Sequence, residues 1–145
     1  MNGERRIAVC SVLLFVYVMA LLLVVLTPGT GGPDRILAAL VDVAVDAGAQ
    51  RRSADNTIEI MLNVLLTAPA TLLASVVWPK PSWRDWTAWA FLLFGTVEAV
   101  QLLLLPARHG SFSDVVANTA GCCLGALVVA AVRRGGARRA ANSPA

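Results

Sequence analysis

The sequence predicts an all-α integral membrane protein: a bundle of four transmembrane helices with a short amphipathic surface helix between the first and second. Composition predicts the membrane setting, because 57% of the 145 residues are hydrophobic and only 14% are charged. A soluble domain is closer to half apolar and a quarter charged. Length predicts the number of helices, since about 20 residues cross a bilayer as a helix. The chain therefore has room for four such helices with short connections.

The first predicted span covers residues 7–26, an apolar run that follows Arg5 and Arg6. A cleavable signal peptide begins in the same way, but its apolar core is only about 7–15 residues long. The segment 28–33 is rich in Pro and Gly, which is typical of a turn. We therefore interpret the run as a retained transmembrane helix, with a signal peptide as the alternative.

Residues 34–48 carry apolar side chains at helical spacing, interrupted by acidic ones. Such a segment is too short and too charged to cross a bilayer. It is typical of an amphipathic helix that lies on the membrane surface. A polar stretch, 50–56, follows, and in it Asp55 or Asn56 is the predicted N-cap of the next helix.

Three further spans are predicted, at 57–78, 86–105 and 114–132. Pro69 lies inside the first of these, so we expect a kink there and a carbonyl, that of Leu65, which needs another partner. The last two spans are joined by only a few residues, which makes them antiparallel neighbours. Together the spans form one domain, 1–132, and the arginine-rich residues 133–145 are predicted to be a disordered cytoplasmic tail.

The distribution of basic residues predicts the orientation. With four spans both termini share one side of the membrane, and that side collects eight of the twelve basic residues, the other side four. Cytoplasmic segments carry the excess of Lys and Arg, so we expect both termini in the cytoplasm of a multi-pass cell-membrane protein. The eight are Arg5, Arg6, Lys80, Arg84, Arg133, Arg134, Arg138 and Arg139, and the four are Arg35, Arg51, Arg52 and Arg108.

Polar residues gather at one depth in the last three spans. With about 1.5 Å of rise per residue, Glu98 lies about 10 Å below the outer surface. An acidic group at a helix centre costs roughly 2.5–3.5 kcal/mol, which favours a functional role for Glu98. Amides at this depth serve equally well as hydrogen bonds between helices. We predict an outward-facing ligand pocket formed by Glu59, Asn63, Glu98, Gln101, Arg108, Asp114 and Asn118.

Other residues are predicted to pack rather than to react. Gly121 and Gly125 have the Gly-x-x-x-Gly spacing of close helix contacts. The cysteines lack metal-ligand spacing and are interpreted as small core residues. We find no motif that specifies an enzyme and expect no metal and no cofactor. Nucleic acid is not an expected partner, because the arginines flank apolar runs; membrane lipids are, and self-association is an open alternative.

The order of these residues resembles the VanZ-like family of small bacterial membrane proteins, whose founding members are associated with teicoplanin resistance. Two blocks carry the resemblance: one runs from Glu98 through Arg108 and Asp114 to Gly125, the other from Glu59 through Asn63 to Pro69. The second block departs from the family pattern, since Thr67, Pro69 and Thr71 stand where the family has an aromatic residue and a Pro-x-Gly turn.

The resemblance implies a protein of the cell envelope that acts at the outer leaflet. Three functions remain open. In the first, the pocket binds a glycopeptide or a lipid-linked cell-wall precursor, and the protein thereby lowers glycopeptide susceptibility. Alternatively, the protein is an enzyme on a lipid-linked substrate, with Glu98 as general base and Arg108 as anion clamp. In the third, it is a structural partner of another membrane complex.

Overall fold

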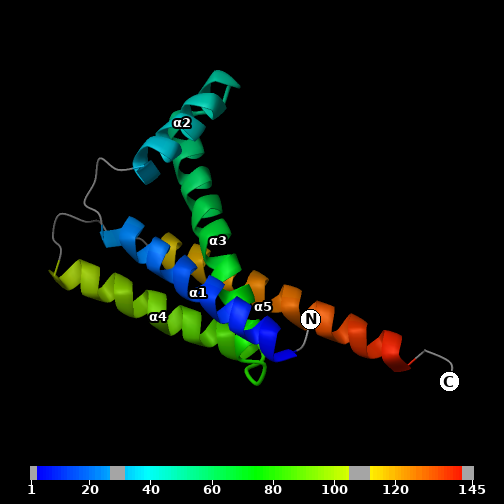
Figure 1. Cartoon of the computed structure of the whole chain (residues 1–145). Coiled ribbons are helices and arrows are strands. Elements are labelled where there is room, and N and C mark those ends of the chain that lie inside the picture. Colours follow the sequence, from blue (N-terminus) through cyan, green and yellow to red (C-terminus); the bar gives the residue numbers. More distant parts are fainter. Residues whose placement is uncertain (1–2, 27–31, 105–111, 142–145) are drawn as a thin grey trace.

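The computed structural model describes residues 3–26, 32–104 and 112–141. Every regular element in these ranges is an α-helix, which confirms the predicted all-α class (Figure 1). In chain order the helices are α1 (Gly3–Leu26), α2 (Gly32–Asp46), α3 (Arg51–Val77), α4 (Trp83–Leu104) and α5 (Phe112–Ala141).

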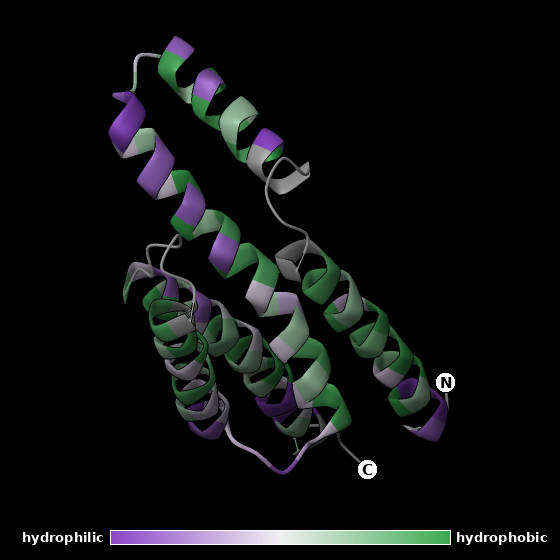
Figure 2. Ribbon diagram, turned by 90° about the vertical axis from the view of Figure 1, so that its left-hand side faces the viewer, coloured by the Kyte–Doolittle hydropathy of each residue, from purple (hydrophilic) through white to green (hydrophobic). Residues whose placement is uncertain are grey.

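The described helices carry the apolar surface of a membrane protein. Of them, α1, α3 and α5 are long and apolar enough to cross a membrane. Large apolar side chains point away from the protein interior, among them Phe15 at 67% exposure and Leu103 at 80%. In Figure 2 hydrophobic residues, drawn in green, follow one another along the helices. Because a monomer in water rarely exposes so much contiguous apolar surface, lipid is the environment that these helices fit.

A core of three helices, α3, α4 and α5, organises the fold. α5 packs most extensively against α3 and next against α4, while α1 and α2 contact α3 (Figure 1). α3 and α5 run in the same direction, and α4 runs back between their ends. The buried residues of this core are mostly small, which brings the helix backbones close together. They include Thr67, Thr71, Ala74 and Ser75 of α3, Ala90 of α4, and Ala117, Gly121, Cys122, Gly125 and Ala126 of α5.

Two glycines set the closest approach of α3 and α5. A Cβ atom at Gly121 would lie 2.0 Å from Thr67 Oγ1 and 2.5 Å from the Val64 carbonyl oxygen. At Gly125 it would lie 2.2 Å from the carbonyl oxygen of Ala68. All three distances are far below van der Waals contact, so the helices meet at a separation that only glycine permits.

α2 and the start of α3 form a helical hairpin. Gly48 has a φ of +98°, and the N–H groups of Gly48 and Ala49 donate to the carbonyls of Val45 and Ala44. This is the Schellman arrangement, in which a glycine ends a helix in the left-handed conformation. The chain then turns into α3, and Val41 of α2 is completely buried. The segment predicted as a surface helix is thus helical and packs on α3.

The N-terminal boundary of α3 corrects the sequence prediction. The helix begins at Arg51 with Gln50 as N-cap, and the Gln50 side chain makes no capping hydrogen bond. Asp55 and Asn56 lie inside the helix, so neither caps it. Hydropathy marks where a helix enters apolar surroundings, whereas the helix itself continues as long as its backbone is supported. Here α2 packs on α3, and Ala54 in the first turns of α3 is buried.

The C-terminal boundary of α5 is a second correction. Residues 133–141 are helical, where the sequence predicted a disordered tail, and 142–145 lie outside the described residues. Alanine and arginine are both good helix formers. Arg138 and Arg139 lie in the last turn, where positive charge interacts favourably with the helix dipole. A charged segment that continues an existing helix avoids the cost of nucleating one.

The helix directions define two ends of the core. The start of α1, the link between α3 and α4, and the end of α5 lie at one end in both views (Figures 1 and 2). Arg133 of α5 donates a hydrogen bond of 3.2 Å to the Pro79 carbonyl in that link, which ties the two segments together. The basic residues that the sequence assigned to one side of the membrane therefore gather at one end of the protein, which we call the basic end.

Candidate functional site

The other end of the α3–α5 contact holds a polar cluster, which we define as Asn63, Thr67, Asp114 and Asn118. The side-chain amide of Asn63 donates to Asp114 Oδ1 at 2.9 Å, joining the two helices. One turn further, Thr67 Oγ1 lies 3.1 Å from the Asn118 carbonyl oxygen and 2.8 Å from that of Asn63, so its hydroxyl is placed to donate to either. Thr67 is buried, and Asn63 and Asp114 are half-buried.

The cluster forms because polar residues have the same spacing on α3 and on α5. Asn63 and Thr67 are four residues apart on α3, and Asp114 and Asn118 are four apart on α5, so each pair lies on one helix face. Since the two helices run in the same direction, the first members of each pair meet and so do the second. Gly121, one turn further along α5, lets the backbones approach closely enough for a short threonine side chain to bridge them.

The third helix of the core, α4, contributes Glu98. This helix packs against α5, and Glu98 is half-buried. Its Oε1 atom is buried and has no hydrogen-bond partner among the described residues. A buried carboxylate oxygen without a partner loses its hydration without compensation. Glu98 is therefore a group whose partner is still to be supplied, by a neighbouring segment or by a ligand.

The remaining predicted pocket residues are placed less closely. Glu59 lies on α3 and is exposed. Gln101 belongs to α4, but its side chain lies outside the described residues, as does Arg108 altogether. The structure thus joins Asn63, Asp114 and the Asn118 backbone directly, with Glu98 on the adjacent helix.

A comparison with protein families identifies the chain at this point. Residues 12–133 match the family model described as VanZ/LLP1. The chain belongs to the VanZ/LLP1 family. This confirms the resemblance seen in the polar motifs and covers most of the chain. No curated protein and no solved structure matches significantly.

The region that matches the VanZ/LLP1 model includes the Thr67 hydroxyl, which was not among the predicted pocket residues. The four-residue spacing puts Thr67 on the same face of α3 as Glu59 and Asn63. In the structure Thr67 lies within hydrogen-bond distance of the opposite helix and against Gly121. Its four-residue spacing from Asn63 was the signal that could have found it.

Near Pro69 the structure contains a contact between helices that the sequence located to within one residue. α3 continues through Pro69 as one helix. The prediction was that the Leu65 carbonyl would need a partner; the structure shows the Tyr17 hydroxyl of α1 donating to the neighbouring carbonyl of Leu66 at 2.8 Å. Tyr17 is the one tyrosine of the chain, and it fixes α1 to α3 by a polar contact in otherwise apolar surroundings.

At the basic end the same three helices and the link between α3 and α4 line a partly open cavity of about 280 Å³. The sequence interpretation treated its arginines only as orientation signals. Arg133 donates to the Ser75 and Pro79 carbonyls, so its guanidinium is fixed at the cavity wall. This cavity brings together the end of α3, the Pro79–Pro81 link and α5, three segments that no sequence pattern connects.

Proposed function

We propose that this VanZ/LLP1 protein is a multi-pass protein of the bacterial cell envelope that binds the polar part of a glycopeptide or of a lipid-linked cell-wall precursor at its polar cluster, and thereby lowers glycopeptide susceptibility. In this proposal α1, α3, α4 and α5 span the membrane. α2 lies on the outer surface and both termini are cytoplasmic, which turns the cluster outward.

The observation that carries the proposal is the unpaired buried oxygen of Glu98 beside a helix pair already joined by Asn63 and Asp114. Polar residues that serve only as contacts between helices are satisfied by one another, as Asn63 and Asp114 are. Glu98 is not satisfied in this way within the described residues. A carboxylate in that condition supports binding of a ligand that donates hydrogen bonds, and both ligand classes carry amide and hydroxyl donors.

Arg108 completes the proposed site. It follows α4 in the sequence, outside the described residues, and in our proposal it pairs with an anionic group of the bound ligand. If the bound precursor were also turned over, Glu98 would be the general base and Arg108 the anion clamp. Replacing Glu98 therefore tests both binding and catalysis.

The decisive experiment replaces Glu98 by Gln, which keeps the size of the side chain but removes its charge and turns one acceptor oxygen into a donor. Purified wild-type protein is titrated with teicoplanin and, separately, with a lipid-linked precursor, and the susceptibility of cells producing each variant is measured. We expect Glu98→Gln to express normally and to lose binding of at least one ligand together with the susceptibility phenotype. Glu4→Gln, which removes an exposed carboxylate at the start of α1, is the matched control.

Two results would reject parts of the proposal. Unchanged binding and phenotype in a less stable Glu98→Gln protein would assign the cluster to helix packing. Release of product from the precursor by wild-type protein, absent with Glu98→Gln, would establish the enzyme instead.

The orientation has its own test. In a variant lacking the native cysteines, Gln50→Cys and Lys80→Cys place single thiols at exposed positions next to opposite ends of α3. We expect a membrane-impermeant reagent to label position 50 and to spare position 80 in intact cells. Labelling of position 80 alone would invert the arrangement and place the polar cluster toward the cytoplasm.

A further inference from the structure

We propose that the basic end is a binding site for an anionic phospholipid, with the phosphate held between α3 and α5 and an acyl chain held against the tryptophans. The inference is independent of the proposed function, because it concerns the opposite end of the core. With about 1.5 Å of rise per residue, Ser75 lies about 18 Å along α3 from Asn63.

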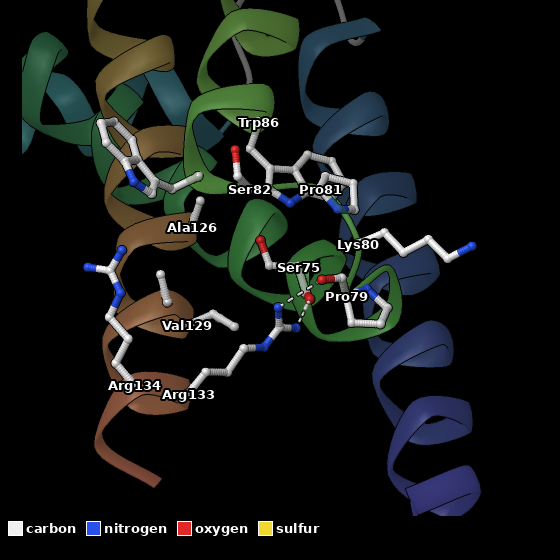
Figure 3. Close-up of a pocket in the computed structure, with 12 residues that line it drawn as sticks. Ser75, Pro79, Lys80, Pro81, Ser82, Trp86, Ala126, Val129, Arg133 and Arg134 are labelled. Carbon is white, nitrogen blue, oxygen red and sulfur yellow. Dashed lines mark hydrogen bonds between the residues drawn. The ribbon is translucent and has the colours of Figure 1, made fainter. Parts of the chain in front are cut away.

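The cavity of about 280 Å³ is lined by hydrogen-bond donors and positive charge. Figure 3 shows Ser75, Trp86 and Arg133 around one space, although they come from α3, α4 and α5. Arg133 crosses one side of it toward the Ser75 and Pro79 carbonyls, and Arg134 follows on α5 (Figure 3).

Two buried polar atoms of this lining have no partner within the described part of the chain. Ser75 is only 3% exposed, yet its Oγ makes no hydrogen bond, and neither does the indole Nε1 of Trp86. Both groups can donate, and a buried donor without an acceptor is costly. A phosphate oxygen in the cavity supplies the acceptor that both lack.

The positive charge of the lining is also uncompensated. Neither Arg133 nor Arg134 forms an ion pair with an acidic side chain in the described residues. Arg133 uses two guanidinium nitrogens for the carbonyls of Ser75 and Pro79, and a guanidinium has five N–H donors, so donors remain. The carboxylate of Asp85, which accepts from the backbone N–H of Ser82 at 2.7 Å, does not line this cavity. An anion is therefore the ligand that this lining recognises.

A second cavity selects a lipid over a soluble phosphate. It measures about 500 Å³ and adjoins the first, with which it shares Pro79, Lys80, Pro81 and Trp86. The rest of its wall is Trp78 and Trp89, and Trp86 packs edge-on against Trp89 with 5.5 Å between ring centroids. A cationic space next to an aromatic one matches a molecule with a phosphate next to a hydrocarbon chain.

The position in the membrane agrees with this ligand. Tryptophans concentrate at the level of the lipid headgroups, and all four tryptophans of the chain lie between positions 78 and 89. Basic pockets between membrane helices at that level bind anionic headgroups. The two cavities thus lie at the depth where such lipids present their phosphates.

The test titrates the full-length protein, in neutral detergent, with phosphatidylglycerol and follows tryptophan fluorescence, which reports from this end alone. We expect saturable binding that becomes about tenfold weaker in Arg134→Gln and in Ser75→Ala, since each removes a hydrogen bond to a charged group. The matched control is Arg138→Gln, which removes the same charge from the same helix but does not line the cavity. It should bind as the wild type does.

Every other outcome contradicts the inference. Equal weakening in Arg138→Gln and Arg134→Gln would show diffuse attraction to the basic helix end. Equal saturation by phosphatidylcholine would show that the phosphate site has no charge selectivity, and saturation by inorganic phosphate at the same concentration would show an anion site without lipid. If Arg134→Gln misfolds, judged by its circular dichroism, Ser75→Ala carries the test, because it removes only the unpartnered hydroxyl.

Discussion

The two ends of the α3–α5 contact are built from the same frame and hold opposite charges. At one end Asn63 and Asp114 pair with each other, and Thr67 approaches the backbone carbonyls of Asn63 and Asn118. At the other, Arg133 binds two carbonyls while Ser75 and Trp86 keep unpartnered donors. Close helix packing alone therefore does not determine function. Within the described residues each end keeps buried polar atoms without a partner, among them an oxygen of the Glu98 carboxylate at one end and the Ser75 and Trp86 donors at the other.

The largest effect should come from breaking the frame that both ends share. Gly125→Val places a side chain against the Ala68 carbonyl, where even a Cβ would lie at 2.2 Å. Backbone atoms cannot move aside as a flexible side chain can, so we expect a loss well above the roughly 1–3 kcal/mol of ordinary overpacking. Thermal unfolding in detergent would show it, together with loss of lipid binding and of ligand binding.

The control for that change is Gly95→Ala in α4, where an added Cβ meets nothing within 4 Å. Alanine is the better helix former, so stability should stay equal or rise slightly. Equal destabilisation by both substitutions would mean that the α3–α5 crossing does not hold the core together.

A smaller effect should separate the two ends. Replacing Asn63 and Asp114 by Ala, singly and together, forms a double-mutant cycle on their 2.9 Å hydrogen bond. Hydrogen bonds between membrane helices have coupling energies of about 0.6 kcal/mol on average and up to about 1.7 kcal/mol, and we expect this one in the upper part of that range. Unfolding free energies of the four proteins give the value.

The same four proteins also test whether the two ends of the α3–α5 contact are independent. Phosphatidylglycerol binding at the basic end should be the same in all four proteins, because the pair lies about 18 Å away along α3. A parallel decline of lipid binding would show that the two ends are coupled. A coupling energy of zero would remove the pair from the description of the cluster.

Depth and helical period were enough to predict much of the polar cluster. The prediction gathered Asn63, Asp114 and Asn118 at one depth, and the structure joins Asn63 to Asp114 and brings Thr67 to the Asn118 carbonyl. They did not predict which partner each side chain takes, because rotation about the helix axis is decided by the contacts at Gly121 and Gly125. These contacts depend on two helices at once, which a single sequence pattern does not describe.

Depth and helical period did not predict the basic cavity. Arg133 and Arg134 flank an apolar run, and such arginines are sufficiently explained by membrane orientation. Their second role appears only when α5 is placed beside the Pro79–Pro81 link. The helical residues 133–141 were missed because Gly135 and Gly136, poor helix formers, follow Arg133 and Arg134 and favour a helix end there, whereas α5 continues through all four.

A weaker effect is expected where α1 joins the core. Tyr17→Phe removes the hydroxyl that donates to the Leu66 carbonyl at 2.8 Å and keeps the ring. We expect a loss of about 1 kcal/mol or less in unfolding free energy, with both ends of the α3–α5 contact unaffected. Phe15→Leu, two residues earlier on α1 and 67% exposed, is the control and should be neutral. If both changes destabilised equally, α1 would be held by apolar packing alone.

The smallest effect concerns the start of α4, next to the basic cavity, and it depends on pH. Asp85 precedes the predicted span 86–105. The Ser82 backbone N–H donates to Asp85 Oδ2 at 2.7 Å, and the Asp85 N–H donates to Ser82 Oγ at 3.3 Å, which together form a capping box. The hydrogen bond from the Ser82 backbone, and then that from its side chain, lowers the pKa of Asp85 below its usual value.

A carboxyl group whose pKa is lower in the folded state stabilises that state above its unfolded pKa of about 3.9 and loses this contribution as pH falls through the folded value. The difference in unfolding temperature between wild type and Asp85→Asn should therefore be full at pH 6 and shrink below pH 4. Ser82→Ala should keep most of the pH dependence, because the backbone N–H remains and is the larger cause of the shift. A difference that stays constant from pH 6 to pH 3 would show that the charge of Asp85 adds nothing to the cap, and the link that borders both cavities would then be held by the prolines and by Arg133.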